Sequence, residues 1–360
     1  MAKVDIKHAF RLCPVHPDDW KLLGYKWRDR WYYDVRLPFG SRSSPFIFNA
    51  FADALAWILV EKFGIPGTTH YLDDFLFPAP SFETCNSRLS TVRGVFKHLG
   101  VPIAEDKLEG PASTMTYLGI EIDAENGIMR LPSDKLSQLR SLVLEWTEKR
   151  KCTKHSLLSL IGSLSFACKV VKPGRTFLRR LIDLSTKVKG LYHHIDITAD
   201  TREDLRVWRM FLTSWNGQSF IPEPPVTSLA LELFTDASQL GYGGFFKGQW
   251  FSEPWPSHPD RHIACLEFFA VFTAVSTWSY KLSNKQIVFT DNESIVFIWE
   301  SGTTKDKPTM ILVRELFFVS TKHNIHIIFR HIPGVINVYA DLLSRLQVQE
   351  FKSACPESSP

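Results

Sequence analysis

The stretch Thr69-His70-Tyr71-Leu72-Asp73-Asp74-Phe75-Leu76-Phe77 places two adjacent acids inside an aromatic and aliphatic run. Its flanks are rich in residues that favour strands, so we expect a hairpin with Asp73-Asp74 at its tight turn. Apolar arms would bury the hairpin against a core and leave both carboxylates at its tip. Two carboxylates held together repel each other unless a cation joins them, and a hard divalent ion is the natural partner. An ordinary Asp-Asp turn is the alternative for this stretch taken alone.

Composition bounds the class of protein. The 360 residues are 44% hydrophobic and 13% aromatic, which suffices for two or three domains with sizeable cores. Six scattered cysteines without a Cys-x-x-Cys pair are typical of free thiols in a reducing compartment. No signal peptide is visible, and no apolar run approaches the roughly 18 residues that cross a bilayer. We expect an intracellular protein, cytoplasmic or nuclear, without a membrane partner.

Basic residues are concentrated in the middle of the chain. Residues 131–220 contain 16 lysines and arginines against 8 acids, whereas residues 226–347 contain 10 against 11. A basic segment next to a near-neutral one suggests that the middle holds a polyanion. A solvated helical surface is the alternative.

The order of the expected elements indicates an α+β fold. In the first part they are a short strand around Asp5, aromatic strands within 20–37, a helix over 45–62, the acidic hairpin, a helix that begins after Ser81 and a hairpin over 116–130. Helices follow over 133–215, interrupted at Pro173-Gly174. Beyond the rigid Pro222-Glu223-Pro224-Pro225, we expect strands at 229–236, 242–247, 249–252, 286–290 and 325–331, and helices at 263–280, 293–301, 308–323 and 337–346. Three strands followed by alternating helices and strands imply a mixed sheet with helices packed on it.

These elements divide the chain into five parts. They are a first domain at 1–130, a helical basic segment at 131–220, a linker at 221–228, a mixed-sheet domain at 229–347 and a polar tail at 348–360. The residues after Phe351 are rich in proline and serine, so we expect the tail to fray.

Three acids of the first domain are candidates for one site. Asp5 and the Asp73-Asp74 pair lie on separate strand-like segments, and they converge if those strands are neighbours. Two magnesium ions ~3.5–4 Å apart would then lie between the carboxylates and a phosphate, which is the arrangement used for in-line phosphoryl transfer.

The first 130 residues resemble the reverse transcriptases of retroelements. The matching pieces, in the family's order and spacing, are Val4-Asp5-Ile6-Lys7-His8-Ala9-Phe10, Leu37-Pro38-Phe39-Gly40 with Ser44-Pro45 and Phe48, Tyr71-Leu72-Asp73-Asp74, Leu99-Gly100 with Lys107, and Tyr117-Leu118-Gly119. The resemblance implies a polymerase palm in which Asp5, Asp73 and Asp74 are the catalytic metal ligands. It also implies that residues 131–220 are a helical thumb or connection.

The resemblance implies substrate contacts for Phe10, Gly40, Tyr71 and Lys107. Phe10 would crowd a ribose 2′-hydroxyl and favour deoxynucleotides, with a core aromatic as the alternative. Gly40 and its loop would pass under the template and the incoming nucleotide. Lys107 would lie near the triphosphate, unless it is a solvated surface charge. Only four residues precede Asp5, whereas the family's fingers lie largely N-terminal to it, so we interpret the chain as a fragment and do not expect unaided DNA synthesis.

Four acids form a second pattern in the C-terminal half. Asp236 and Asp291 each end a strand-like run, Glu267 lies in an apolar helix, and Asp341 opens the last helix. An unpaired charge in an apolar helix is costly, and strand ends are places where carboxylates converge. We therefore expect a second metal site, although any one of these acids alone could be a helix cap or a surface charge.

This half resembles ribonuclease H in its order of elements and in its Asp-Glu-Asp-Asp set. The resemblance implies two-metal hydrolysis of the RNA strand of an RNA–DNA hybrid, with Asp236, Glu267, Asp291 and Asp341 as catalytic ligands. The 2′-hydroxyl would mark the strand as RNA. His331, in Arg330-His331-Ile332-Pro333-Gly334, would assist product release or proton transfer.

The C-terminal motifs also suggest a lineage. His331-Ile332-Pro333-Gly334, Asn337 and Ala340-Asp341-Leu342-Leu343-Ser344-Arg345 look like the polyproteins of gypsy-type and tyrosine-recombinase (DIRS-like) retrotransposons. We favour the latter because of the short spacing between palm and nuclease.

The predicted cofactors are two Mg²⁺ ions per active site, with Mn²⁺ as a substitute. The predicted partners are an RNA template, a DNA primer, an RNA–DNA hybrid, deoxynucleoside triphosphates and other parts of the element's polyprotein. Two alternatives are open: a catalytically decayed or co-opted module that only binds nucleic acid, and a stand-alone nuclease that uses the palm as a platform.

Overall fold

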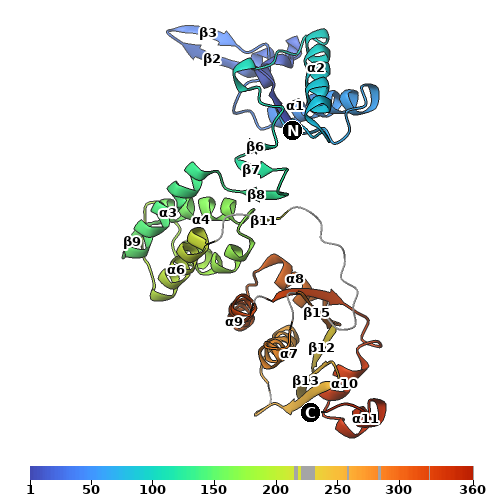
Figure 1. The fold of residues 1–360 in the computed structure, drawn as a ribbon. Coiled ribbons are helices and arrows are strands. Elements are labelled where there is room, and N and C mark those ends of the chain that lie inside the picture. The colour runs from blue at the N-terminus through green and yellow to red at the C-terminus, as the bar shows by residue number, and fades with distance from the viewer. Residues whose placement is uncertain (215–217, 220–231, 258, 283–284, 324, 360) are drawn as a thin grey trace. The chain divides into compact units, whose positions relative to one another are not determined.

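The computed structural model describes residues 1–214, 218–219, 232–257, 259–282, 285–323 and 325–359 (Figure 1). The chain divides into two compact units. The first contains Met1–Ser133 with Gly217–Ile221, and the second contains Asp134–Asn216 with Pro222–Pro360. The linker expected at 221–228 lies outside the described residues.

A three-stranded antiparallel sheet forms the centre of the first unit. Its strands are, in order, β1 (Ala2–Asp5), β5 (Asp74–Phe77) and β4 (Thr69–Tyr71). Helices α1 (Ser44–Trp57) and α2 (Phe82–His98) pack on it and bury Phe48 and Phe96 in the same core as Phe75. The Ser81 hydroxyl accepts a hydrogen bond from the Thr84 N–H, so α2 begins with the N-cap that the sequence predicts.

The acidic hairpin differs from the expectation by one residue. Tyr71 pairs with Asp74, so the two-residue turn is Leu72-Asp73 and not Asp73-Asp74. Leu72 has a φ of 54°, the left-handed conformation that such turns demand. Because β5 begins at Asp74 and pairs with β1, one acid lies in the turn and the other lies on the strand opposite Asp5.

Two further sheets complete the first unit. They are the hairpin of β2 (Gly24–Trp27) and β3 (Arg30–Tyr33), and a sheet with the order β11 (Gln218–Ser219), β8 (Ile128–Arg130), β7 (Ile120–Asp123), β6 (Thr114–Tyr117). The hairpin expected over 116–130 is therefore a meander. Leu118 and Gly119 have φ angles of 47° and 79° and make an additional turn that the sequence analysis did not foresee.

The continuous helix Ser44–Lys62 consists of α1 and a π-helical turn, η3 (Ile58–Lys62). It has 19 residues and a mean hydropathy of 1.3, so by length and composition alone it passes as a membrane span, which no other described helix does. The expectation that no apolar run approaches this length was wrong. The helix packs on the core of the first unit through the buried Phe48, Leu55 and Leu59. Only 28% of its apolar window is buried, and Phe46 and Trp57 are exposed.

Helices dominate the first part of the second unit, as the sequence predicts. Its elements are α3 (Ser133–Glu148), β9 (Lys151–Thr153), α4 (Lys154–Ala167), the 3₁₀ helix η5 (Lys172–Phe177), α5 (Arg179–Thr186), β10 (His194–Asp196) and α6 (Ala199–Ser214). The break expected at Pro173-Gly174 lies within η5. A Cβ at Gly174 would lie 2.2 Å from the ring of the fully buried Trp208, so only glycine fits there.

A five-stranded mixed sheet forms the second part of this unit. Its order is β14 (Gln249–Pro254), β13 (Gly241–Phe246), β12 (Glu232–Ala237), β15 (Lys285–Thr290), β16 (His326–His331). The first three strands are antiparallel, whereas β15 and β16 continue parallel to β12. The helices are α7 (Ile263–Trp278), α8 (Glu293–Ser301), α9 (Lys307–Lys322), α10 (Val338–Ser344) and α11 (Val348–Ala354). The mixed sheet with packed helices is as expected.

The C-terminal tail packs against the sheet, contrary to the expectation that it frays. Phe351 of α11 is fully buried, and its ring lies 5.4 Å from Trp250 and 5.9 Å from Phe245. The backbone N–H of Trp250 donates to the Ser359 carbonyl oxygen at 3.1 Å. A single buried aromatic side chain and edge pairing with β14 therefore order a segment whose composition is otherwise polar.

A buried ion pair connects the helical part of the second unit to its sheet part. Asp204 of α6 is fully buried and Arg314 of α9 is 7% exposed. Arg314 donates to both carboxylate oxygens of Asp204, with Nη1 3.2 Å from Oδ2. The Arg314 guanidinium also lies 4.7 Å from the centre of the Phe177 ring. The two parts thus share one interior.

Candidate active sites

The first candidate site contains the three acids expected from the sequence. Asp5 ends β1 and is 9% exposed, Asp74 opens β5 directly opposite, and Asp73 lies in the adjoining turn. Burial raises the pKa of Asp73 and of Asp74, and the negative charge of Asp5 raises both further. The oxygens of Asp5, Asp73 and Asp74 do not all lie within 4.8 Å of one another. A hard divalent cation would neutralise the carboxyls of Asp73 and Asp74, whose pKa values are raised.

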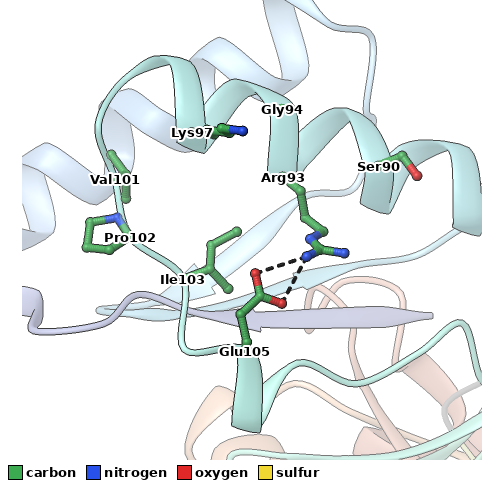
Figure 2. A pocket seen from close by; sticks show the side chains of 8 residues that line it. All are labelled: Ser90, Arg93, Gly94, Lys97, Val101, Pro102, Ile103 and Glu105. Carbon is green, nitrogen blue, oxygen red and sulfur yellow. Dashed lines mark hydrogen bonds and ion pairs between the residues drawn. The ribbon is translucent and has the colours of Figure 1, made fainter.

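Lys107 lies at this first site. Its Nζ donates to Asp5 Oδ2 at 3.0 Å, and this hydrogen bond raises the pKa of Lys107. Lys107 belongs to the 3₁₀ turn η4 (Glu105–Lys107), which α2 anchors because Arg93 Nη2 lies 3.0 Å from both Glu105 oxygens (Figure 2). The hollow around this ion pair is lined by none of the predicted site residues.

The other residues predicted for the first site differ in burial, since Phe10 is half-buried and Gly40 and Tyr71 are exposed. The half-buried Phe10 ring lies 5.3 Å from Phe39 and 5.5 Å from Phe48. Gly40 is exposed with a φ of 88°, and Tyr71 is 62% exposed. The sequence analysis missed a contact of Tyr117, whose hydroxyl donates to the Asp74 carbonyl oxygen at 3.0 Å and thereby fixes the strand that carries this acid.

The second candidate site brings together Asp236, Glu267 and Asp291. One carboxylate oxygen from each lies within 4.8 Å of the others, which no other His, Cys, Asp or Glu triplet achieves in the described part of the chain. Asp236 lies near the end of β12 and Asp291 directly follows β15, so the parallel pairing of these strands places both at one edge of the sheet. Glu267 reaches the same point from α7 and is 7% exposed.

Burial dominates the electrostatics of this triplet. Burial raises the pKa of Asp236 to about 6 and the pKa of Glu267 to about 7, and the neighbouring carboxylates contribute in the same direction. Hydrogen bonds oppose the shift only in part. Glu267 accepts from Asn292 Nδ2 at 3.1 Å and from Thr290 Oγ1 at 3.4 Å.

Asp341 and His331 lie outside the compact triplet. Asp341 of α10 is near enough to raise the pKa of Asp236, but its Oδ1 accepts a hydrogen bond from Arg345 Nε at 2.8 Å. His331 ends β16, and its Nδ1 lies 3.9 Å from Glu293 Oε1. The loop after β16 passes close to the site, because a Cβ at Gly334 would lie 3.0 Å from Asp291 Oδ2.

The sequence analysis missed the uncharged side chains that hold these acids. Ser344 Oγ donates to Asp236 Oδ2 at 2.5 Å, and Asn292 and Thr290 hold Glu267. All three stand beside predicted ligands in the sequence or one helical turn away, and Thr290 directly precedes Asp291. Asn292 follows Asp291, and Ser344 lies three residues after Asp341, on the same face of a helix.

Comparison with known proteins identifies the first part of the chain. Residues 1–122 match the family described as "Reverse transcriptase (RNA-dependent DNA polymerase)". The chain carries a reverse transcriptase domain. This family implies dependence on a divalent metal.

The reverse transcriptase domain is of the kind found in viral and retroelement polyproteins. Over 96% of its length, the chain is 21% identical to Polyprotein P3 of Commelina yellow mottle virus and 22% identical to the putative enzymatic polyprotein of Cassava vein mosaic virus. It spans 18% of the first relative and 52% of the second. A shorter match, 27% identical over 128 residues, is to the Gag-Pol polyprotein of Gibbon ape leukemia virus.

Solved structures confirm the α+β fold, in which the palm of the reverse transcriptase domain is followed by a further domain. The foamy viral protease-reverse transcriptase in complex with RNA/DNA hybrid has a TM-score of 0.52 and 17% identity, covering 91% of this chain and 43% of that one. The same enzyme in complex with dsDNA also has a TM-score of 0.52 and 17% identity, covering 92% and 68%.

Proposed function

We propose that the second site is a ribonuclease H that hydrolyses the RNA strand of an RNA–DNA hybrid with two divalent ions, Mg²⁺ or Mn²⁺. The observation that carries this proposal is the gathering of Asp236, Glu267 and Asp291 within 4.8 Å at one edge of the mixed sheet. The donor set fits hard cations, because it consists of carboxylate oxygens. When bound, the ions would activate the attacking water and stabilise the leaving 3′-oxygen.

The chain's own residues would then have distinct roles. Asp236, Glu267 and Asp291 bind the ions, and Asp341 joins them once it leaves Arg345. Asn292 and Thr290 hold the Glu267 carboxylate through hydrogen bonds to its two oxygens. For His331 we propose a role in product release or proton transfer, supported by its place at the end of β16, two strands from Asp236.

For the first site we propose RNA-directed DNA synthesis within a larger polyprotein. Asp5, Asp73 and Asp74 would hold the ions, with an RNA template, a DNA primer and deoxynucleoside triphosphates as substrates. Phe10, Gly40, Tyr71 and Lys107 keep the substrate-binding roles expected for them. The nucleic-acid complexes of the foamy viral enzyme and the basic segment 131–220 support such partners.

Hybrid cleavage tests the ribonuclease H proposal. We would compare cutting of a labelled RNA–DNA hybrid in Mg²⁺ or Mn²⁺ by the wild type, Asp236→Asn and Asp291→Asn, with exposed Asp260→Asn as the control. We expect metal-dependent cleavage of the RNA strand that either site variant abolishes and the control retains. A folded wild type that binds hybrid without cutting it would favour the alternative, a decayed or co-opted binding module.

Primer extension tests the polymerase proposal. The chain is assayed with an N-terminal fingers segment restored, and Asp73→Asn serves as the inactive comparison. Extension by the wild type alone would support a polymerase. Hybrid cleavage without any extension would favour the stand-alone nuclease.

Two further proposals concern origin and location. The Asp341-Leu342-Leu343-Ser344-Arg345 motif supports a DIRS-like or gypsy-type retrotransposon, and the coding sequence next to this one would decide between them. A tyrosine recombinase there supports the DIRS-like lineage, and an integrase supports the gypsy type. Six free cysteines support an intracellular location, in the cytoplasm or the nucleus, which imaging of a tagged chain would test.

A further inference from the structure

We propose that Ser344 is a positioning residue of the second site, whose hydroxyl fixes the Asp236 carboxylate and ties it to the helix that carries Asp341. The inference deepens the proposed ribonuclease H function and rests on it for the catalytic consequence. The inference itself concerns how the site binds metal, and metal affinity can be measured without any cleavage of substrate.

The contact between Ser344 and Asp236 is short and shielded from water. Ser344 Oγ lies 2.5 Å from Asp236 Oδ2, Ser344 is fully buried, and Asp236 is 8% exposed. The carboxylate cannot rotate about its Cβ–Cγ bond without losing this hydrogen bond. One oxygen is therefore held by the protein, and the other has a defined direction.

The helix that supplies Ser344 is itself fixed to the sheet at its C-terminal end. Ser238 Oγ donates to the Ser344 carbonyl oxygen at 2.8 Å, and Ser252 Oγ donates to the Leu343 carbonyl oxygen at 2.7 Å. These hydroxyls satisfy carbonyl groups that a helix end leaves without intrahelical partners. At the other end of α10, Asn337 Nδ2 donates to the Thr235 carbonyl oxygen at 3.1 Å. The strand before Asp236 and the helix of Asp341 are thus joined at both ends.

Ser344 contacts both Asp236 and Asp341, so its position affects the orientation of both acids. It lies one helical turn after Asp341, and its Oγ is also 2.9 Å from the Asp341 carbonyl oxygen. Alanine would keep the helix but leave Asp236 Oδ2 without the one side-chain donor described for it. Partners that orient metal ligands in this way typically change metal affinity or activity by ~10–100-fold when they are removed.

The experiment compares Ser344→Ala, Ser344→Thr and the control Ser320→Ala. Ser320 is a buried residue of α9 whose hydroxyl donates to the carbonyl oxygen of Phe317, three residues earlier, at 2.8 Å. The control therefore removes the same kind of intrahelical bond without a described carboxylate contact. The readouts are Mn²⁺ affinity by calorimetry on EDTA-stripped protein, and kcat and KM on RNA–DNA hybrid.

We expect Ser344→Ala to weaken Mn²⁺ binding and to lower kcat, each by ~10–100-fold. KM for hybrid should stay within about two-fold, because a fully buried hydroxyl cannot contact substrate. Ser344→Thr should recover most of both losses, and Ser320→Ala should resemble the wild type. A merely structural role would instead lower the melting temperature and leave the Mn²⁺ affinity of the folded fraction unchanged.

The outcomes separate this inference from the proposed function. If wild type and Ser344→Ala bind Mn²⁺ equally, the inference is overturned whether or not the protein cleaves hybrid. If the wild type binds Mn²⁺ without cutting hybrid, the proposed function fails, and the difference in Mn²⁺ affinity still decides the role of Ser344. If Ser344→Ala does not fold, Ser344→Thr decides: wild-type affinity supports the role of the hydroxyl, and weak binding by folded protein refutes it. If the wild type binds no Mn²⁺, both are overturned.

Discussion

A carboxylate that is buried beside other carboxylates holds its proton more tightly than it does in water. Asp236 and Glu267 are in this state, and their pKa values of about 6 and about 7 compare with ordinary values of 3.8 and 4.5. Between about pH 4 and pH 7, the metal-free folded chain therefore binds more protons than the unfolded chain. A group whose pKa is raised by folding in this way favours the folded state at low pH and opposes it once it ionises.

The first prediction is that metal-free Glu267→Gln gains stability relative to the wild type as the pH rises from about 4.5 to about 7.5. The wild type must ionise a buried carboxyl over this range, whereas glutamine stays neutral. Melting temperatures in EDTA at several pH values measure the difference. In the wild type, Mn²⁺ should bind more tightly as the pH rises to about 7, because the ion competes with protons. A pH-independent difference between the two proteins would contradict the raised pKa of Glu267.

The second prediction concerns the ammonium group at the first site. Lys107→Ala removes the cation that contacts Asp5, so it should lower the melting temperature of the first unit in EDTA. Mn²⁺ should reduce this loss, because it supplies the missing positive charge. The exposed Lys97→Ala on α2 is the control and should be neutral. A loss for Lys107→Ala that Mn²⁺ leaves unchanged would mean that the lysine does not neutralise the acids.

Residues differ in how well their roles can be predicted from the sequence. The gathering of Asp236, Glu267 and Asp291 could be predicted, because an isolated charge among apolar residues is costly and so points to a cation. The donors Ser344 and Tyr117 could not, because serine and tyrosine are common in both surface and core positions. Their roles depend on contacts over 108 and 43 residues of sequence separation, which local patterns do not encode.

At the scale of elements, the position of α10 depends on a residue with no side chain. A Cβ at Gly243 would lie 2.4 Å from Leu343 Cβ and 3.1 Å from the Ser344 nitrogen. The strand β13 and the helix α10 therefore approach each other more closely than any larger residue allows. The close approach is also what brings Ser344 to Asp236.

The third prediction is that Gly243→Ala displaces α10 and weakens the second site. Overpacking of this kind typically costs ~1–3 kcal/mol in the free energy of unfolding, and Mn²⁺ affinity should fall with it. Gly162→Ala, in α4, is the matched control, because no atom lies within 4 Å of its added Cβ. That change should be neutral or add ~0.5–1 kcal/mol of stability. Urea unfolding and calorimetry measure both, and an unchanged Mn²⁺ affinity in Gly243→Ala would show that α10 tolerates the shift.

The order and type of elements could be read from hydrophobic periodicity, whereas turns and edges could not. The mixed sheet follows from short apolar runs that alternate with helical patterns, as in 286–290 and 293–301. The turns at Leu72-Asp73 and Leu118-Gly119 use left-handed leucines, and leucine carries no signal for that conformation. Phe351 is the buried residue of α11, and its neighbours in the sequence are mostly polar, so the hydrophobic pattern does not predict the docking of this helix.

At the scale of the whole molecule, the second unit combines the helical segment and the mixed sheet, which the sequence analysis separated at a linker. Charge and proline content mark a boundary between them, but the pair of Asp204 and Arg314 spans 110 residues of sequence. Arg180 adds a further hydrogen bond to Asp204 at 3.2 Å. Because two arginines hold this fully buried carboxylate, we expect the sheet part to unfold together with α6.

The fourth prediction is that Arg314→Met destabilises the whole second unit. Removal of one partner from a buried ion pair typically costs ~3–5 kcal/mol, because the remaining charge is left without compensation. The double variant Asp204→Leu with Arg314→Met should cost less than the single change, since no buried charge then remains. Arg206→Met is the control, because its partner Glu203 lies beside it on the exposed face of α6 and such pairs contribute ~0–1 kcal/mol.

Hydrogen exchange followed by mass spectrometry locates the loss of stability. Faster exchange in both α6 and β12, with the first unit unchanged, would establish that the helical segment and the sheet unfold together, whereas exchange confined to α9 would mean that the ion pair is a local contact.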